Sequence, residues 1–157
     1  MVFESIIAIF QAYGLFGLFI TSIISSLFFF PGLSPLLIPF YSLQFPSWQI
    51  FIAITSGSII GGFINYYIGF FGYEIFYVRK IKKSHDWQRR MKSAKNWSNK
   101  WGKFSVLIAN AIPFFPADFL NLFVGFFRQD IKLFLLGMSI GKAIQFAILV
   151  FAAGILI

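Results

Sequence analysis

The 157-residue chain is 59% hydrophobic and only 11% charged, and it carries 24 phenylalanines, no cysteine and a net charge of +8. Soluble domains contain about 25% charged residues, so this composition excludes an ordinary soluble domain and indicates a membrane protein. The lack of cysteine excludes disulfides and thiol chemistry.

The first predicted element is an apolar helix over residues 1–26. Its stretch 5–26 is long enough to cross a hydrocarbon core of about 30 Å. The stretch lacks the basic start and the small-residue cleavage site of a signal peptide, so we expect the helix to be retained.

The second segment, residues 27–46, is uncharged but contains four prolines. A proline inside a helix costs about 3 kcal/mol. Broken backbone at membrane depth is tolerated only where it is buried in protein or faces water. We therefore predict a re-entrant hairpin broken at Pro31 and Pro35. Residues 48–71, without charge or proline, then predict a spanning helix.

A strongly basic stretch follows at residues 79–103. It holds ten of the thirteen Lys and Arg residues and one acid, Asp86, for a net charge of 10 − 1 = +9. The pattern predicts an amphipathic helix, ended by Gly102, that lies on an anionic membrane surface on the cytoplasmic side. The residues expected to bind that surface are Trp87, Arg89, Arg90, Trp97 and Trp101. Nucleic-acid binding uses similar residues, but the flanking membrane segments argue against a nucleic-acid partner.

The stretch 110–127 combines apolar residues with helix breakers and polar groups. Pro113 and Pro116 predict a second re-entrant hairpin, and Asp118 lies just beyond them. The last segment, residues 133–157, predicts another spanning helix, whose one charge is Lys142.

Residues 57–68 and 137–148 resemble each other at an offset of 80 positions. Two glycines and an amide recur: Gly57 with Gly137, Gly61 with Gly141, and Asn65 with Gln145. The glycines predict close helix packing. If the second hairpin returns to its own side, Arg128 and Lys132 join the basic stretch there, as the positive-inside rule favours. The two units then form an inverted repeat, an architecture common among secondary transporters.

The predicted fold is therefore an all-α integral membrane protein with a single domain over residues 1–157. The first helix (1–26) precedes repeat unit one (27–78), the basic cytoplasmic helix (79–103) and repeat unit two (104–157). Each repeat unit consists of a proline-broken re-entrant hairpin and a spanning helix.

Four stretches carry a resemblance to a known family: "FPGLSP", "GSIIGGFINYYIG", "IPFFPADFLNLFVG" and "GMSIGKAIQF". In their order and spacing the chain resembles the DedA superfamily, also called the VTT or SNARE-associated Golgi protein family, and especially its short YqaA-like branch. The resemblance implies two facing hairpins and movement of lipids across the bilayer. Asp118 and Lys142 match the YqaA-like pattern. Larger members carry acids or arginines where this chain has Ser34, Pro35, Gly62, Asn110 and Pro116.

Asp118 and Lys142 are the two charges expected at membrane depth. A central charge costs about 2.5–3.5 kcal/mol on insertion scales, so each is a functional candidate. The functional hypothesis is that the two residues pair with each other, or that Lys142 binds a lipid phosphate while Asp118 modulates that binding. The alternative is a purely structural ion pair.

Four amide side chains are further candidates for the substrate path. Asn65 and Gln145 are placed to hydrogen-bond the hairpin tips or to join helices. Asn110 and Asn121 flank the second hairpin, where they line a cavity or satisfy broken backbone.

The leading functional prediction is a translocase for phospholipids or polyprenyl-phosphate lipids in the plasma membrane. The alternatives are a membrane scaffold that associates through its glycine faces and a small proton-coupled solute transporter that uses Asp118. No catalytic triad, metal-spaced cluster or glycine-rich phosphate loop is present in the sequence, so we expect no enzyme activity, metal or cofactor. The expected partners are membrane lipids, whose anionic headgroups lie at the basic helix. The sequence also allows a homo-oligomer.

Overall fold

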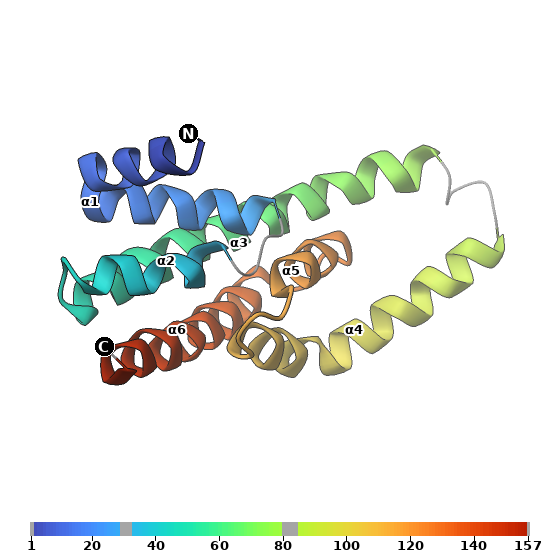
Figure 1. Cartoon of the computed structure of the whole chain (residues 1–157). Helices are drawn as coiled ribbons and strands as arrows, with labels where there is room; N and C mark the ends of the chain where they lie inside the picture. The colour runs from blue at the N-terminus through green and yellow to red at the C-terminus, as the bar shows by residue number, and fades with distance from the viewer. Residues whose placement is uncertain (1, 29–32, 80–84, 157) are drawn as a thin grey trace.

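The computed structural model describes residues 2–28, 33–79 and 85–156, with side chains for 13–28, 34–75 and 85–153 except positions 87, 94, 98 and 103. This part of the chain consists of helices joined by turns and contains no strand, which confirms the all-α prediction (Figure 1). The helices are α1 (Val2–Leu27), α2 (Leu33–Ser42), α3 (Ser47–Arg79), α4 (His85–Ala111), α5 (Ala117–Phe126) and α6 (Ile131–Leu156).

Two helices are long and apolar enough to cross a membrane: Ser47–Ile75 within α3 and Ile131–Ala153 within α6. They contain the predicted spanning segments 48–71 and most of 133–157. In Figure 1 they lie side by side and run in opposite directions.

The first helix is interrupted at Gly14, whose φ of 53° and ψ of −136° are not helical. Glycine adopts this conformation readily because it lacks a Cβ. Beyond the kink, Tyr13–Leu27 is an apolar helix shorter than the two candidate spans. It runs antiparallel to α2 (Figure 1). The helix predicted over residues 1–26 is thus kinked, and its second half pairs with α2. The first hairpin therefore begins before Leu27, its predicted start.

The proline-rich segment is more helical than predicted. Pro35 is the third residue of α2 and does not break it, because a proline in the first helical turn removes no intrahelical hydrogen bond. Pro39 lies inside the same helix and Pro46 directly precedes α3. Pro31, the other predicted breaker, lies outside the described residues.

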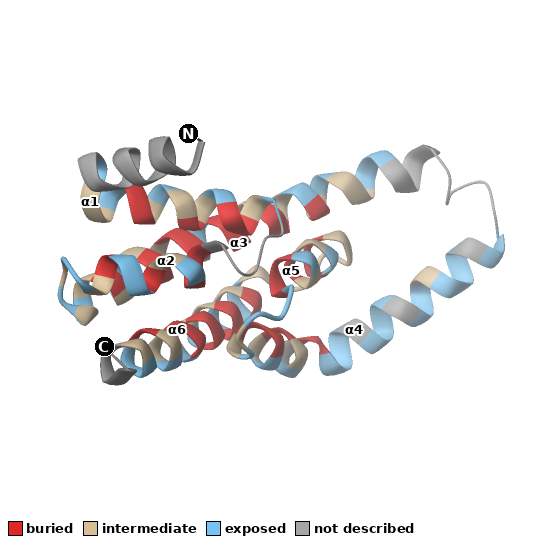
Figure 2. Cartoon of the chain, viewed as in Figure 1, coloured by how far each residue is buried: buried red, intermediate tan, exposed pale blue. Residues whose placement is uncertain are grey.

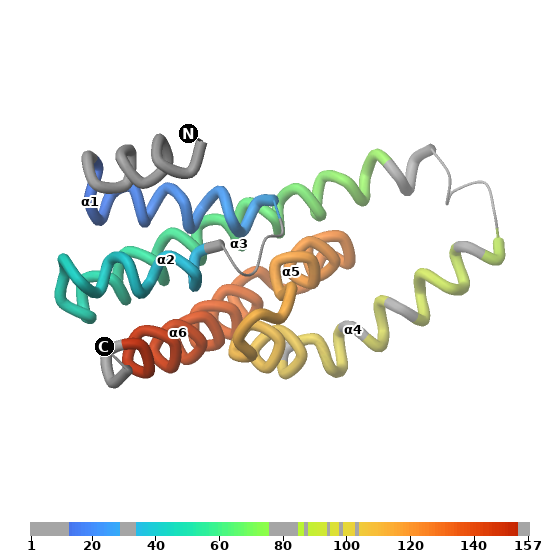
Figure 3. The backbone as a smooth tube through the Cα atoms, in the orientation of Figure 1, coloured from blue at the N-terminus to red at the C-terminus, as the bar shows by residue number. Residues whose placement is uncertain are grey.

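The basic helix continues beyond its predicted end. α4 passes through Gly102 and reaches Ala111, so the prediction that Gly102 ends the helix is wrong. A Cβ at Gly102 would lie 2.1 Å from Nε2 of Gln129, so this glycine allows the glutamine to pack against α4. The chain turns at residues 112–116, which include Pro113 and Pro116, and α5 runs back beside α4 (Figure 3). We call α4 and α5 hairpin two, and Tyr13–Leu27 and α2 hairpin one.

The interior has two apolar clusters. The first joins Leu18, Ile38, Ile54 and Phe146, and the second joins Tyr66, Val106, Val124, Phe134 and Met138. Each cluster lies between one hairpin and the pair of long helices, as the buried positions in Figure 2 indicate.

The outer faces of the long helices are also apolar. Ile52, Ile60 and Ile68 on α3 and Ile140 and Ile148 on α6 are all exposed. An apolar exterior this extensive is typical of a surface that lipid or another protein covers.

Candidate functional site

The two charges predicted at membrane depth form a buried ion pair. Nζ of Lys142 lies 2.9 Å from Oδ1 of Asp118. Lys142 is 3% exposed and Asp118 is 9% exposed. Asp118 occupies the first turn of α5, where the unpaired N–H groups of a helix favour a carboxylate. The turn that Pro113 and Pro116 produce therefore places the carboxylate against the middle of α6.

An amide network extends the ion pair across hairpin two. Nδ2 of Asn110 donates to Oδ1 of Asn121 at 3.1 Å, and Nδ2 of Asn121 donates back to Oδ1 of Asn110 at 3.3 Å. Nδ2 of Asn121 also lies 3.4 Å from Oδ1 of Asp118. Both asparagines are fully buried. The network joins the two arms of the hairpin and orients the carboxylate towards Lys142.

A small polar hollow lies beside the ion pair, where the two hairpins meet. It has a volume of about 20 Å³, which is room for about one water molecule. Its polar lining is Ser25 and Ser26 at the end of α1, Ser34 at the start of α2, Ser58 on α3, Asp118 on α5, and Lys142 and Gln145 on α6. Both hairpins and both long helices thus contribute polar groups to one point. Sequence reasoning missed the role of Ser25, Ser26 and Ser58, although two adjacent serines at the end of an apolar helix were an available signal.

The two repeat-related amides make equivalent contacts. Nδ2 of Asn65 donates to the carbonyl of Ser26 at 2.8 Å, and Nε2 of Gln145 donates to the carbonyl of Ile112 at 3.4 Å. Each acceptor lies at the end of the first arm of a hairpin. The amides thus hold the first arm of hairpin one to α3 and the first arm of hairpin two to α6. Oδ1 of Asn65 is buried and has no hydrogen-bond partner among the described residues.

The predicted packing glycines lie against the chain's own hairpins. A Cβ at Gly57 would be 2.5 Å from the carbonyl oxygen of Phe19, and one at Gly61 would be 2.5 Å from Cβ of Ser26. On the other unit, a Cβ at Gly141 would be 2.6 Å from the carbonyl oxygen of Leu107, and Gly137 is buried. These faces are therefore occupied within the chain.

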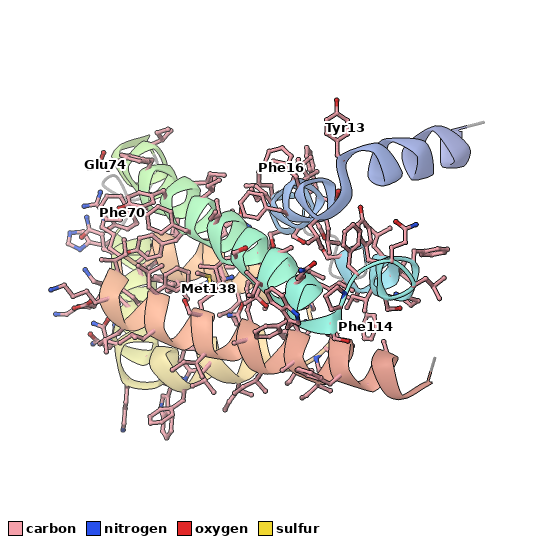
Figure 4. The ribbon with its side chains drawn as sticks, turned by 90° about the vertical axis from the view of Figure 1, so that its left-hand side faces the viewer. Tyr13, Phe16, Phe70, Glu74, Phe114 and Met138 are labelled. Atoms are coloured by element: carbon pink, nitrogen blue, oxygen red, sulfur yellow. The ribbon has the colours of Figure 1, made fainter. Side chains whose placement is uncertain are left out.

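Gly62 holds the repeat position of Lys142, 80 residues earlier, and faces it. A Cβ there would lie 2.4 Å from Sδ of Met138, 3.2 Å from Nδ2 of Asn121 and 3.5 Å from Cε of Lys142. Figure 4 shows Met138 between α3 and α6 at this level. The missing side chain leaves space for the lysine to reach Asp118.

A closer crossing, between α3 and α5, was not anticipated. A Cβ at Gly69 would lie 1.9 Å from the carbonyl oxygen of Leu122, and one at Gly125 would lie 1.9 Å from the carbonyl oxygen of Tyr66. These two glycines let the backbones touch, which positions Asp118 at the start of α5.

The basic end of the molecule carries the predicted surface-binding residues. Arg89, Arg90, Trp97 and Trp101 are exposed on α4, while the side chain of Trp87 is outside the described set. Arg128, after α5, forms an ion pair with Glu74 near the end of α3 (Nη2–Oε1 2.7 Å). Figure 4 shows Glu74 and Phe70 together at this end. Arg128 thus lies beside the last turns of α3, which lead into the basic stretch.

A family model described as the VTT domain matches residues 30–154. The chain belongs to the VTT domain family. This confirms the resemblance to the DedA/VTT proteins that the four sequence stretches indicated. No curated protein and no solved structure matched the chain.

The VTT domain contains α2 to α5 and nearly all of α6, and hence the ion pair and the amide network. The first arm of hairpin one, with Ser25 and Ser26, precedes the matched range. The polar hollow is thus built from the VTT domain together with the end of α1.

Proposed function

We propose that this VTT domain protein is a membrane lipid translocase that moves a phospholipid or a polyprenyl-phosphate lipid across the bilayer. One observation carries the proposal: a buried ion pair and a serine-lined hollow lie where two helical hairpins meet, inside a molecule with an apolar exterior. We further propose that both hairpins are re-entrant, that the units form an inverted repeat, and that the protein resides in the plasma membrane with its basic helix in the cytoplasm.

The chemical argument concerns the headgroup. A phosphate that crosses hydrocarbon without partners loses its hydration, whereas a path lined by hydroxyls and an ammonium group replaces part of it. Lys142 and the serines of the hollow supply such groups. The lipid tails stay in the membrane along the apolar outer face. Asp118 neutralises Lys142 when no phosphate is present, so the lysine avoids the cost of an unpaired buried charge.

The size of the hollow implies a conformational step. A volume of about 20 Å³ holds a water molecule and no headgroup, so the structure corresponds to a closed state. Opening requires Ser25, Ser26 and Ser34 of hairpin one to move away from Asp118 of hairpin two. The hydrogen bonds from Asn65 and Gln145 tie the first arm of hairpin one to α3 and that of hairpin two to α6, and the close crossing of α3 and α5 joins the two halves. We therefore expect the movement to be confined to the hairpin ends beside the hollow.

The competing scaffold hypothesis is favoured by the small size of the chain and by the missing hairpin acids, and it uses the glycine faces for association. Gly57, Gly61 and Gly141 instead pack against the chain's own helices, so those faces are already occupied. A proton-coupled solute transporter would need Asp118 to exchange protons, and its test is a pH gradient in the assay below.

The test is translocation of a fluorescent phospholipid and of a prenyl phosphate in proteoliposomes, with wild type compared with Asp118→Asn and Lys142→Met at equal insertion. Lys132→Met, which removes an exposed charge from the same helix α6, is the matched control. We expect movement in the wild type and the control, and little in the two variants. A wild type that folds but moves neither lipid above empty liposomes would refute the proposal. Transport that requires a pH gradient would favour proton coupling through Asp118.

A further inference from the structure

Two hollows adjoin at the basic end of the molecule. The first, of about 260 Å³, is lined by Lys92 and Lys95 of α4 and by Arg128. The second is an apolar groove of about 580 Å³ between α4 and α5. Phe127 lines both. We propose that the two hollows form one site for an anionic phospholipid, with its phosphate among the three cations and an acyl chain in the groove.

The cationic hollow has the chemistry of a phosphate site. No acidic side chain occurs among the described residues that line it. Gln88 and Tyr73 add neutral polar groups at its wall. A phosphate oxygen accepts charge-assisted hydrogen bonds from guanidinium and ammonium groups, which are about twice as strong as neutral ones.

Arg128 is held in position before any ligand arrives. Its guanidinium lies 4.6 Å from the ring centre of Phe70 and 4.9 Å from that of Tyr73, and one of its nitrogens bonds to Glu74. The guanidinium has five N–H donors, and Nε is buried without a partner among the described residues. Because the side chain is already held in one conformation, binding costs less conformational entropy.

The backbone at Arg128 is consistent with a role for its side chain. The residue lies two positions after the end of α5 and has a φ of 52°, and its N–H donates to the carbonyl of Gly125 at 2.8 Å. Helices commonly end in this left-handed conformation with glycine, which has no Cβ to clash. An arginine here retains local strain that glycine would relieve, as is frequent where a side chain is used for binding.

The groove has the shape of an acyl-chain site. Its volume lies within the roughly 300–1,000 Å³ typical of ligand pockets. Phe119 and Phe123 of α5 form one wall, and Gly102 and Ser105 of α4, which are small, leave the space open. At one end it includes Trp97 of the basic helix, and at the other Pro116, two residues before Asp118.

The arrangement favours a lipid over a peptide or a second copy of the chain. Charge and apolar surface are separated into adjoining halves, as in a phospholipid, and the groove opens on an exterior that is itself apolar. As a loading position for the lipid that later reaches Lys142, the site rests on the proposed function. Binding at the site can be measured without transport.

The first experiment titrates phosphatidylglycerol and phosphatidylcholine of the same acyl chains onto the detergent-purified full chain, with native mass spectrometry as the readout. We expect one phosphatidylglycerol to bind in preference. Lys92→Gln with Lys95→Gln weakens that binding about tenfold or more, since a basic residue near an anionic lipid contributes on the order of 1 kcal/mol. Lys100→Gln with Lys132→Gln removes the same charge from exposed positions outside the hollow and leaves the preference nearly intact.

The second experiment tests the tail half of the site. Ser105→Phe fills the groove and weakens binding of both lipids, whereas Ile108→Phe, on the same helix but outside the groove, does not. Equal losses of phosphatidylglycerol binding in the two double charge variants would mean that the lipid is attracted by the overall positive charge of the surface. That result would overturn the proposed site. A lipid-free dimer of the wild type would identify the groove as an interface between copies and also overturn it.

The two proposals fail differently. A wild type that binds phosphatidylglycerol as expected but moves no lipid overturns the proposed function and leaves the site standing. A wild type that moves lipid but shows no headgroup preference overturns the site alone.

Discussion

The ion pair between Asp118 and Lys142 offers a double-mutant cycle that separates its structural role from its role in transport. At 2.9 Å, and with an effective dielectric constant of about 20, two unit charges attract by about 6 kcal/mol. Burying each ion costs several kcal/mol, so the intact pair contributes little net stability. Removing one partner leaves the other charge buried and unpaired, which costs about 3–5 kcal/mol.

The structure also orders the two single variants. After Lys142→Met, the carboxylate of Asp118 retains Nδ2 of Asn121 at 3.4 Å and the N-terminus of α5. After Asp118→Asn, the ammonium group of Lys142 loses its ion pair, the only one it has among the described residues, and keeps at most a neutral amide oxygen as an acceptor. We therefore expect Asp118→Asn to destabilise more than Lys142→Met, with both near the 3–5 kcal/mol range and the double variant within about 1–2 kcal/mol of wild type.

The assay is reversible unfolding in mild detergent, followed by proteoliposome transport for each variant that folds. A double variant that regains stability but moves no lipid would assign the charges to transport. A double variant that regains both would make the pair structural. If the double variant is as unstable as the sum of the single variants, the two charges do not compensate each other, and the reasoning from the 2.9 Å contact is refuted.

Three further predictions concern the packing. Gly125→Ala should cost several kcal/mol in detergent unfolding or prevent folding, because its Cβ would lie 1.9 Å from a backbone oxygen. Gly72→Ala is the control: nothing lies within 4 Å of the added Cβ, so the substitution should stabilise the protein by up to about 1 kcal/mol. Similar effects of the two substitutions would contradict the close crossing of α3 and α5. Gly14→Ala should lower stability by about 1 kcal/mol or more through its φ of 53°, and an unchanged melting temperature would argue against the kink. Asn110→Ala should cost about 1–3 kcal/mol by leaving Oδ1 of Asn121 without its donor, and adding Asn121→Ala should cost less than Asn121→Ala alone; full additivity of the two substitutions would refute the reciprocal pair.

Much of the architecture was predictable because the determining physics is local in the chain. The length of their apolar stretches identifies α3 and α6 as candidate spans. Pro113 and Pro116 mark a turn because proline does not fit in the interior of a helix. Asp118 and Lys142 stood out because a charge in an apolar segment is expensive wherever it lies. The amide pair at an offset of 80 also pointed to equivalent contacts at the two hairpins.

Other features depend on which residues meet in space, and sequence patterns do not specify those contacts. Gly102 has the properties of a helix end, but Gln129 from a distant turn packs against it, so α4 continues. Gly14 interrupts α1, although the apolar pattern of the sequence continues on both sides of it. The sequence by itself determined a helical membrane protein with a proline-marked turn at residues 112–116 and two charges in apolar segments, because hydrophobicity and proline geometry act locally. Only the tertiary structure decided that the charges pair, that serines from three helices surround them, and that α1 forms an arm of hairpin one, because each depends on packing between segments far apart in the chain.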